Sequence, residues 1–288
     1  MRVIERYEAP ATLEEALRFM TGGEATIYAG GTDLVPRIRE GLGGVTPLLL
    51  NIRRIPALGE VSLGDGVVRV GALCTVANLL QNGLLRDSAP ILAEVADHFA
   101  SGQVRNSATI GGNLCNASPA ADLVIPLLLL DAEVELAAWS DAGPVRRTLP
   151  LHDFFMAPGV TRRRPEELLT GVRFPIPAPG FRSMCKKFGT RPAMDIAVVS
   201  VGIGGRWVDG ALHAPRVAFG AVAPVPLRGR RTEAALAGKV LDDGVVAAAV
   251  REAAAETAPI SDVRASAWYR TELIRVMTRR SLEAVRGN

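Results

Sequence analysis

Two short glycine-containing segments are the part of this sequence best suited to chemistry. They are Ile27–Leu34 (IYAGGTDL) and Thr109–Asn113 (TIGGN), and each places two adjacent glycines after apolar or small residues. Adjacent glycines let a backbone reach positive φ and come close to a ligand. Amide N–H groups in such a turn can converge on an anion such as a phosphate. Either segment alone is more typical of a tight turn, but the pair predicts a site for a ligand with two phosphates or an extended nucleotide.

Three charged residues, two of them beside these segments, have both a structural and a functional interpretation. Asp33 and Asp122 lie beside the glycine segments. The commonest role of aspartate in a loop is to cap a turn, but both could instead bind ribose hydroxyls or orient the loop amides. Lys187 could be a surface lysine, or a cation that faces a phosphate or a flavin ring.

The other reactive residues form no recognisable catalytic set. The sequence has no G-x-G-x-x-G fingerprint, no Walker A motif and no G-x-S-x-G elbow. The histidines stand alone, at His98, His152 and His213. The cysteines are too far apart for a zinc or iron–sulfur site within this chain and fit a reducing cytoplasm; they are Cys74, Cys115 and Cys185. We therefore expect no catalytic acid–base pair and no metal site, and an organic cofactor to supply the chemistry.

The bulk composition is that of a globular protein with room for two domains. The chain has 288 residues, 48% hydrophobic and 22% charged, and a formal net charge of +3. Two arginine clusters, Arg162–Arg164 and the set around Arg230, are typical of solvated loops. Aromatic content of 5% offers little surface for base stacking, so we do not expect nucleic-acid binding. The longest apolar run, Leu123–Leu130, is too short to span a membrane, and we expect a cytoplasmic protein.

The first glycine segment is expected to join a strand to a short helix. Ala25–Ala29 is a short apolar run that leads into the segment, and Leu34–Arg39 follows as a helix with Pro36 in its first turn. An earlier helix is predicted to begin after Thr12, because Glu15 completes a capping box with that residue.

The second glycine segment lies within Phe99–Asp122, a long stretch of small residues. Surface linkers have a similar composition, but they rarely run directly into a buried helix such as the one predicted over Leu123–Leu130. A small-residue loop attached to a core element is suited to a site where an extended ligand lies along the backbone.

Several strands are expected around these segments, together with a hairpin turn at Gly64–Gly66. The predicted strands are Leu48–Ile52, Val61–Leu63, Val67–Val70, Ala132–Ala138, Val145–Leu149 and Glu166–Phe174. Three prolines then interrupt the pattern, at Pro175, Pro177 and Pro179. We place a domain boundary there, so that residues 1–175 form the first domain.

Residues 178–288 are predicted to form a smaller α+β domain. Three apolar runs, Met194–Ile203, Val208–His213 and Arg216–Val222, predict a three-stranded antiparallel sheet. Two helices are expected to follow, over Val245–Glu256 and Ser266–Val285.

Three motifs in this order resemble the FAD-binding medium subunit of the molybdenum hydroxylases, the xanthine dehydrogenase and carbon monoxide dehydrogenase type. They are AGGTDL (Ala29–Leu34), GQVRNSATIGGNLCNASPAADL (Gly102–Leu123) and KFGTRPAMDIAVVS (Lys187–Ser200). The resemblance covers nearly the whole chain. It implies an FAD-binding domain of the vanillyl-alcohol-oxidase type over 1–175, made of two α+β subdomains, and the family's C-terminal flavoprotein domain over 178–288.

The resemblance also implies a set of cofactor-binding residues. The two glycine segments would wrap the FAD pyrophosphate, and Phe99 would line the site. Asp122 would bind toward the adenosine end, Leu169 would contact the adenine region through its backbone, and Lys187 would lie near the isoalloxazine, so that Asp122 and Lys187 mark the outer ends of the ligand. The full set is Ile27, Tyr28, Ala29, Gly30, Gly31, Thr32, Asp33, Leu34, Phe99, Thr109, Ile110, Gly111, Gly112, Asn113, Asp122, Leu169 and Lys187.

The function implied by the resemblance is electron transfer. Electrons would leave a molybdenum cofactor on a large subunit, cross two [2Fe–2S] clusters on a small subunit and reach this FAD. The FAD would then reduce NAD, a quinone or another acceptor, in a dimer of heterotrimers. Thr32 and Asp33 stand where carbon monoxide dehydrogenases have His-Ser, which disfavours CO as substrate. The alternatives are a free-standing flavin oxidase of the same fold and a basic scaffold or nucleic-acid binder.

Overall fold

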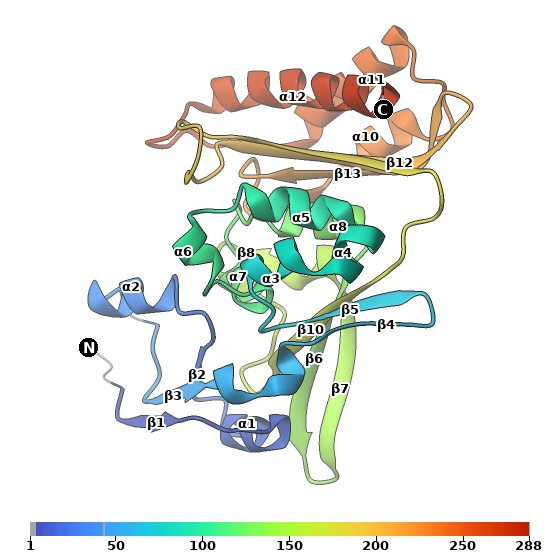
Figure 1. The fold of residues 1–288 in the computed structure, drawn as a ribbon. Coiled ribbons are helices and arrows are strands. Elements are labelled where there is room, and N and C mark those ends of the chain that lie inside the picture. The colour runs from blue at the N-terminus through green and yellow to red at the C-terminus, as the bar shows by residue number, and fades with distance from the viewer. Residues whose placement is uncertain (1–3, 43, 288) are drawn as a thin grey trace.

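The computed structural model describes residues 4–42 and 44–287, and the N-terminal part of the chain forms two α+β subdomains (Figure 1). The first subdomain has a three-stranded parallel sheet in the order β1-β3-β2. Its strands are β1 (Arg6–Glu8), β2 (Ala25–Tyr28) and β3 (Leu48–Asn51), and its helices are α1 (Leu13–Met20) and α2 (Leu34–Arg39). The predicted capping box at Thr12 and Glu15 is confirmed.

The second subdomain has a five-stranded antiparallel sheet in the order β4-β5-β10-β6-β7. Its strands are β4 (Val61–Gly64), β5 (Val67–Gly71), β6 (Glu133–Ser140), β7 (Gly143–Pro150) and β10 (Leu168–Pro175). The predicted hairpin is confirmed, because β4 and β5 pair on either side of Asp65 and Gly66. The helices are α3 (Val76–Gln81), α4 (Gly83–Ser88), α5 (Pro90–Asp97), α6 (Gly102–Arg105), α7 (Ile110–Asn116), α8 (Val124–Leu129) and α9 (Leu151–Phe154). Two short 3-10 turns, η1 (Ile52–Arg54) and η2 (Pro56–Leu58), and the small pair β8 (Phe155–Ala157) and β9 (Val160–Thr161) complete it.

The C-terminal domain has a four-stranded antiparallel sheet, so the prediction of three strands was wrong. The strands are β11 (Phe181–Phe188), β12 (Val199–Val208), β13 (Ala211–Gly220) and β14 (Leu227–Arg228). The predicted runs Val208–His213 and Arg216–Val222 fall mainly on one strand, β13, and the pattern missed both the short β14 and β11. Strand β11 was missed because this edge strand is half-buried along its whole length and carries Arg, Ser and Lys. The helices are α10 (Arg230–Leu236), α11 (Asp243–Glu256) and α12 (Ala267–Gly287).

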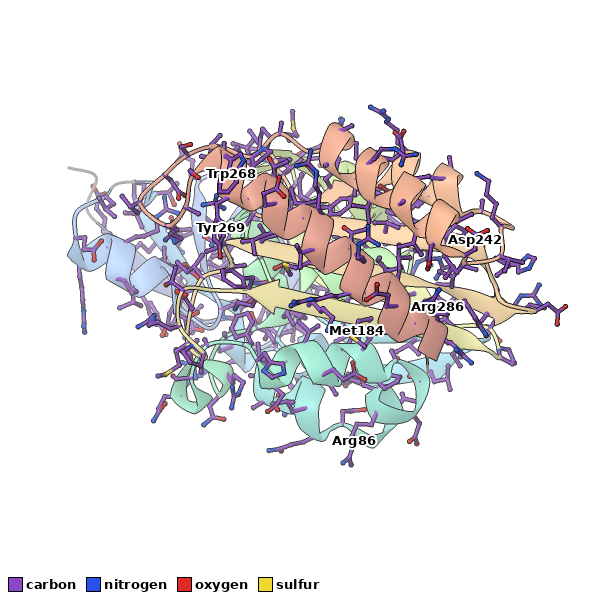
Figure 2. All side chains as sticks on the ribbon, turned by 90° about the horizontal axis from the view of Figure 1, so that it is seen from above. Arg86, Met184, Asp242, Trp268, Tyr269 and Arg286 are labelled. Atoms are coloured by element: carbon purple, nitrogen blue, oxygen red, sulfur yellow. The ribbon has the colours of Figure 1, made fainter. Side chains whose placement is uncertain are left out.

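The C-terminal sheet is covered on both faces. Helices α5 and α8 of the second subdomain pack on one face, and α10, α11 and α12 form a layer on the other (Figure 1). Figure 2 shows α12 crossing the outside of the sheet, with Trp268 and Tyr269 near one end and Arg286 near the other. Gly202 allows α8 to come this close, because a Cβ there would lie 2.7 Å from Cγ2 of Ile125.

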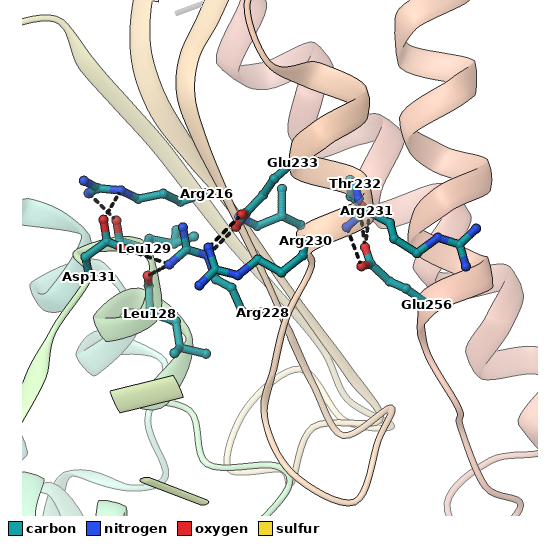
Figure 3. Close-up of polar contacts among 11 residues, drawn as sticks. Leu128, Leu129, Asp131, Arg216, Arg228, Arg230, Arg231, Thr232, Glu233 and Glu256 are labelled. Carbon is teal, nitrogen blue, oxygen red and sulfur yellow. Dashed lines mark hydrogen bonds and ion pairs between the residues drawn. The ribbon is translucent and has the colours of Figure 1, made fainter. Parts of the chain in front are cut away.

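An ion cluster ties the C-terminal domain to the end of α8 (Figure 3). Arg216 Nε lies 2.7 Å from Asp131 Oδ2, and Arg228 Nη1 lies 2.5 Å from Asp131 Oδ1. Arg216 also donates to the Leu129 carbonyl at 2.8 Å, and Arg228 pairs with Glu233 of α10. The cations therefore satisfy carbonyl groups at the C-terminus of a helix while they hold two parts of the chain together. Within the described residues, no helix is both long and apolar enough to cross a membrane.

Candidate functional site

The two glycine segments meet at a cavity of about 510 Å³. Its wall is formed by the first segment, the start of α7, strand β10 and the chain around residues 159–165. Thirteen of the predicted site residues line it: Ile27, Ala29, Gly30, Gly31, Thr32, Asp33, Leu34, Phe99, Thr109, Gly111, Gly112, Asn113 and Leu169. A cavity of this size suits a small organic ligand.

Two of the glycines are needed because backbone packs against them. A Cβ at Gly30 would lie 2.1 Å from the carbonyl oxygen of Ser107, just before the second segment. A Cβ at Gly111 would lie 2.8 Å from the carbonyl oxygen of Ala72. Gly30 therefore brings the first segment against the chain that leads into the second, and Gly111 seats α7 on the chain after β5.

The first segment leaves a row of amides available to a ligand. Gly31 has a φ of +72°, the left-handed conformation that favours glycine. Among the described residues, no backbone or side-chain acceptor lies within hydrogen-bonding reach of the amides from Gly30 to Leu34. Asp33 precedes α2 and lines the cavity, and its side chain makes no capping bond to the helix. Unpaired amides in a turn of this kind are typical of an anion-binding site.

The second segment is the start of a helix, so the expectation of a glycine turn with free amides was wrong there. Thr109 is the N-cap of α7, and its Oγ1 accepts a hydrogen bond from the Gly112 amide at 3.1 Å. The amides of Ile110, Gly111 and Asn113 donate to the carbonyls of Cys74, Ala72 and Thr109. Neither Gly111 nor Gly112 has a positive φ. The side chain of Asn113 differs, because its Oδ1 is buried without a partner among the described residues. A buried amide oxygen on a cavity wall needs a hydrogen-bond donor, which a bound ligand can supply.

Four predicted residues do not line this cavity, and two of them, Ile110 and Tyr28, lie within the glycine segments. Ile110 is fully buried in the core of the second subdomain. Tyr28 lies behind the first segment, where a Cβ on Gly31 would come within 2.4 Å of its ring. The guanidinium of Arg53 lies 5.9 Å from the centre of the same ring.

Asp122 and Lys187 do not lie at opposite ends of a ligand, because they form an ion pair. Lys187 Nζ donates to Asp122 Oδ2 at 2.7 Å. Burial raises the pKa of the Asp122 carboxyl, and the nearby Lys187 ammonium opposes that rise. The other oxygen, Asp122 Oδ1, is buried and has no partner among the described residues. The pair lies at a second cavity of about 350 Å³, lined by residues of α5, α8, β11 and β12, with His98, Glu94 and Asp97 among them.

Sequence reasoning missed two cations on the wall of the first cavity, Arg37 and Arg163. Arg163 belongs to the run that the composition assigned to a solvated loop. Its Nη1 instead donates to the Glu167 carbonyl at 2.6 Å and to the carbonyls of Arg164 and Pro165. No local pattern could have revealed this, since the position of Arg163 depends on the fold of the loop after β9. Arg37 lies on α2, three residues after the first segment. This short spacing could have identified Arg37 from the sequence as a cation near the ligand.

The thiols are not suited to metal binding or nucleophilic chemistry. Burial raises the pKa of Cys74 to about 12, and burial also raises the pKa of Cys115 and of Cys185. Among residues 4–42 and 44–287, no three His, Cys, Asp or Glu side chains are grouped to hold a metal ion.

Two family descriptions match almost the whole chain. Residues 2–177 match the FAD binding domain in molybdopterin dehydrogenase, and residues 185–285 match the CO dehydrogenase flavoprotein C-terminal domain. The glyceraldehyde dehydrogenase medium chain of Sulfolobus acidocaldarius is 31% identical over 281 residues, with 97% of each chain covered. The xanthine dehydrogenase FAD-binding subunit of Escherichia coli O157:H7 is 31% identical over 283 residues, with 97% of this chain and 95% of that one covered.

Solved structures agree with these matches. A carbon monoxide dehydrogenase from Hydrogenophaga pseudoflava that lacks the Mo-pyranopterin moiety superposes with a TM-score of 0.93 at 30% identity, covering 99% of this chain and 98% of that one. Quinoline 2-oxidoreductase from Pseudomonas putida 86 superposes with a TM-score of 0.90 at 30% identity, covering 98% and 96%. With its two-loop cavity and two-part domain match, this chain belongs to the family of FAD-binding medium subunits of the molybdenum hydroxylases, the xanthine and carbon monoxide dehydrogenase type.

Proposed function

We propose that this chain is the electron-transfer subunit of a molybdenum hydroxylase. It accepts electrons from [2Fe–2S] clusters of a partner subunit and passes them to NAD, a quinone or another acceptor. The observation that carries the proposal is the row of unpaired amides from Gly30 to Leu34, which faces the same cavity as the orphaned Asn113 Oδ1. When bound, FAD supplies an isoalloxazine that takes up and releases electrons.

The residues on the first cavity fit a dinucleotide that carries two phosphates. The amides of the first segment would bind the pyrophosphate, and the cations Arg37 and Arg163 would balance its charge. Asn113 Oδ1 would accept a hydrogen bond from an N–H or O–H group of FAD. Phe99 and Leu169 supply apolar wall, which suits an aromatic ring.

We place the flavin end of the cofactor on the Phe99 side of the cavity, toward the Asp122–Lys187 pair. Phe99 lines the first cavity and its chain neighbour His98 lines the second, so the two cavities are adjacent along the chain. A half-buried ammonium such as that of Lys187 stabilises negative charge on a reduced flavin. In this role Asp122 holds Lys187 in position and belongs to the flavin end, while the adenosine end lies among the residues of β2 and α2.

The metal cofactors are assigned to other subunits. The described part of this chain groups no three metal-ligating side chains, so we place the [2Fe–2S] clusters on a small partner subunit and the molybdenum cofactor on a large one. We further propose a dimer of such heterotrimers in the cytoplasm, where the three free cysteines would stay reduced.

The test is the flavin content of the purified chain. We expect a yellow protein that releases close to one FAD per chain on denaturation, or that takes up added FAD with quenching of its fluorescence. The variant Asn113→Ala, which removes the orphaned acceptor, should hold FAD more weakly than Asn113→Asp, which keeps an oxygen in place. A colourless chain that also fails to bind added FAD would contradict the proposal.

A free-standing flavin oxidase is the second candidate. It is favoured by one observation, the second cavity beside Lys187 with His98, Glu94 and Asp97 on its wall. Oxygen consumption by the isolated FAD-loaded chain with a small-molecule substrate would support this candidate, whereas electron transfer only in the presence of iron–sulfur and molybdenum subunits would support the first.

A further inference from the structure

Exposed apolar side chains gather on the outer side of the C-terminal domain, around the start of α12. Trp268 is 71% exposed, Tyr269 is 40% exposed and Val263 is 99% exposed. Ile260, in the segment before α12, and Ile196, in the loop between β11 and β12, are also exposed. Figure 2 shows Trp268 and Tyr269 on the outermost helix of this layer. We name these five residues the α12 patch. Exposed apolar side chains gathered in one region are typical of a protein interface, and Trp and Tyr are enriched among the residues that dominate binding energy.

The turn that carries Val263 is held rigidly in place. Asp262 Oδ1 accepts hydrogen bonds from the Arg264 and Ala265 amides and, at 2.7 Å, from Arg270 Nη2. The Arg270 side chain is buried, and its Nη1 donates to the carbonyls of Val198 and Ala221. The turn is therefore tied to the base of β12, and it holds Val263 in the solvent. A surface that is ordered before binding loses less conformational entropy when a partner docks.

The α12 patch and the second cavity lie on opposite faces of the C-terminal sheet, at the same end of β11. Tyr269 packs edge to face against Phe188, with ring centres 6.0 Å apart. Phe188 follows Lys187, whose ammonium pairs with Asp122 at the second cavity. A protein seated on the patch would therefore be separated by the thickness of one sheet from the residues that we propose for the redox end of the cofactor.

The charge that protrudes around the α12 patch is positive. Arg191 and Arg264 extend from the two neighbouring loops, with side chains that are 64% and 38% exposed. The nearby carboxylates are largely covered, because Asp195 accepts hydrogen bonds from the amides of its own loop and Asp262 from those of its turn. Farther along α12, Arg275 pairs with Glu272, and among the described residues no carboxylate pairs with the exposed Arg279 or Arg280. Such a rim favours a partner with acidic groups around an apolar centre.

We propose that the α12 patch docks an acidic face of the iron–sulfur subunit that delivers electrons to the flavin. The identity of this partner rests on the proposed function, whereas the position of the interface rests on the exposed apolar residues, the rigid turn and the cationic rim.

The experiment measures binding of the purified [2Fe–2S] partner subunit to the FAD-loaded chain. Two variants, Trp268→Glu and Val263→Glu, place a negative charge in the α12 patch at positions that are exposed. The matched control is Val145→Glu, on the half-exposed strand β7 of the second subdomain. FAD content and thermal unfolding are measured for each variant, so that a folding defect is separated from a docking defect. Affinity is measured between low and high NaCl.

We expect parent-level FAD content in all three variants. Binding of the partner should weaken by roughly tenfold or more in Trp268→Glu and Val263→Glu, stay unchanged in Val145→Glu, and weaken with rising NaCl in the parent. Parent-like affinity and salt dependence in both patch variants would overturn the inference. So would a parent that self-associates through the patch and binds the partner elsewhere. If the parent holds no FAD but still binds the partner through the patch, the proposed function fails and the docking inference stands.

Discussion

The two glycine segments have the same paired glycines but differ in what their backbone does. In the first segment, Gly31 turns the chain and the amides from Gly30 to Leu34 remain available. In the second, Thr109 starts a helix, and the four amides that follow it are all paired within the protein. The difference comes from the residue two positions before the glycines, because Thr109 is an N-cap that promotes a helix and Tyr28 occupies the corresponding position in the first segment. The anion-binding surface is thus the first segment, and the second contributes side chains and close packing.

The largest expected effect is at Gly30, where the first segment touches the chain that leads into the second. Gly30→Ala places a Cβ 2.1 Å from the Ser107 carbonyl oxygen, so the chain must shift. We expect a loss of about 1–3 kcal/mol in the free energy of unfolding, together with loss of bound FAD, measured by urea unfolding of the FAD-free chain and by flavin release. The control is Gly22→Ala, since nothing lies within 4 Å of a Cβ there. Equal losses in both variants would show that the packing of Gly30 against Ser107 contributes nothing specific to stability or to FAD binding.

The next effect concerns Gly31 and its support by Tyr28. Gly31→Ala is destabilising for two reasons. Residue 31 has a φ of +72°, and its added Cβ would lie 2.4 Å from the Tyr28 ring. The left-handed conformation alone costs about 1–2 kcal/mol for a residue with a Cβ. In a Tyr28→Ala background the steric term disappears, so the cost of Gly31→Ala should fall. A double-mutant cycle on unfolding free energy measures this difference, and strictly additive effects would mean that Tyr28 does not support the segment.

A smaller effect is expected from the cap of the second segment. Thr109→Val removes the Oγ1 that accepts from the Gly112 amide, and we expect a loss of about 1 kcal/mol in unfolding free energy. Thr109→Ser should retain most of the stability. If FAD affinity fell in Thr109→Val as far as in Gly31→Ala, the second segment would bind the pyrophosphate as directly as the first, and the contrast between the segments would not hold.

The smallest effect on the fold is expected at Gly112. A Cβ there meets only Thr109 Oγ1, at 2.9 Å, and alanine is favoured over glycine within a helix by about 1 kcal/mol. These two terms oppose each other, so Gly112→Ala should unfold within about 1 kcal/mol of the parent. Because Gly112 also lines the cavity, its FAD affinity should fall if the cofactor lies against α7. Isothermal titration of the FAD-free chain would detect this, and an unchanged affinity would place the cofactor away from α7.

Local sequence determined the features that depend on neighbours along the chain. The capping box at Thr12, the hairpin at Asp65 and Gly66, and the helices α11 and α12 follow from short-range hydrogen bonding and apolar periodicity, whereas α10 was not predicted. The three motifs were specific enough to indicate the family, and with it the FAD-binding domain. Strand β11 was not predicted because an edge strand with mixed side chains has no clear hydrophobic period.

The tertiary structure alone decided which distant residues meet. Asp122 and Lys187 are 65 residues apart and form one ion pair, where family likeness had set them at opposite ends of a ligand. Gly30 packs against Ser107. Arg163, which was predicted to lie on a solvated loop, lines the cavity. Such contacts depend on how the subdomains and the C-terminal sheet pack together, and that packing is fixed by side chains far apart in the sequence. The sequence by itself therefore determined the kind of cofactor, and the fold decided which amides and side chains are free to bind it.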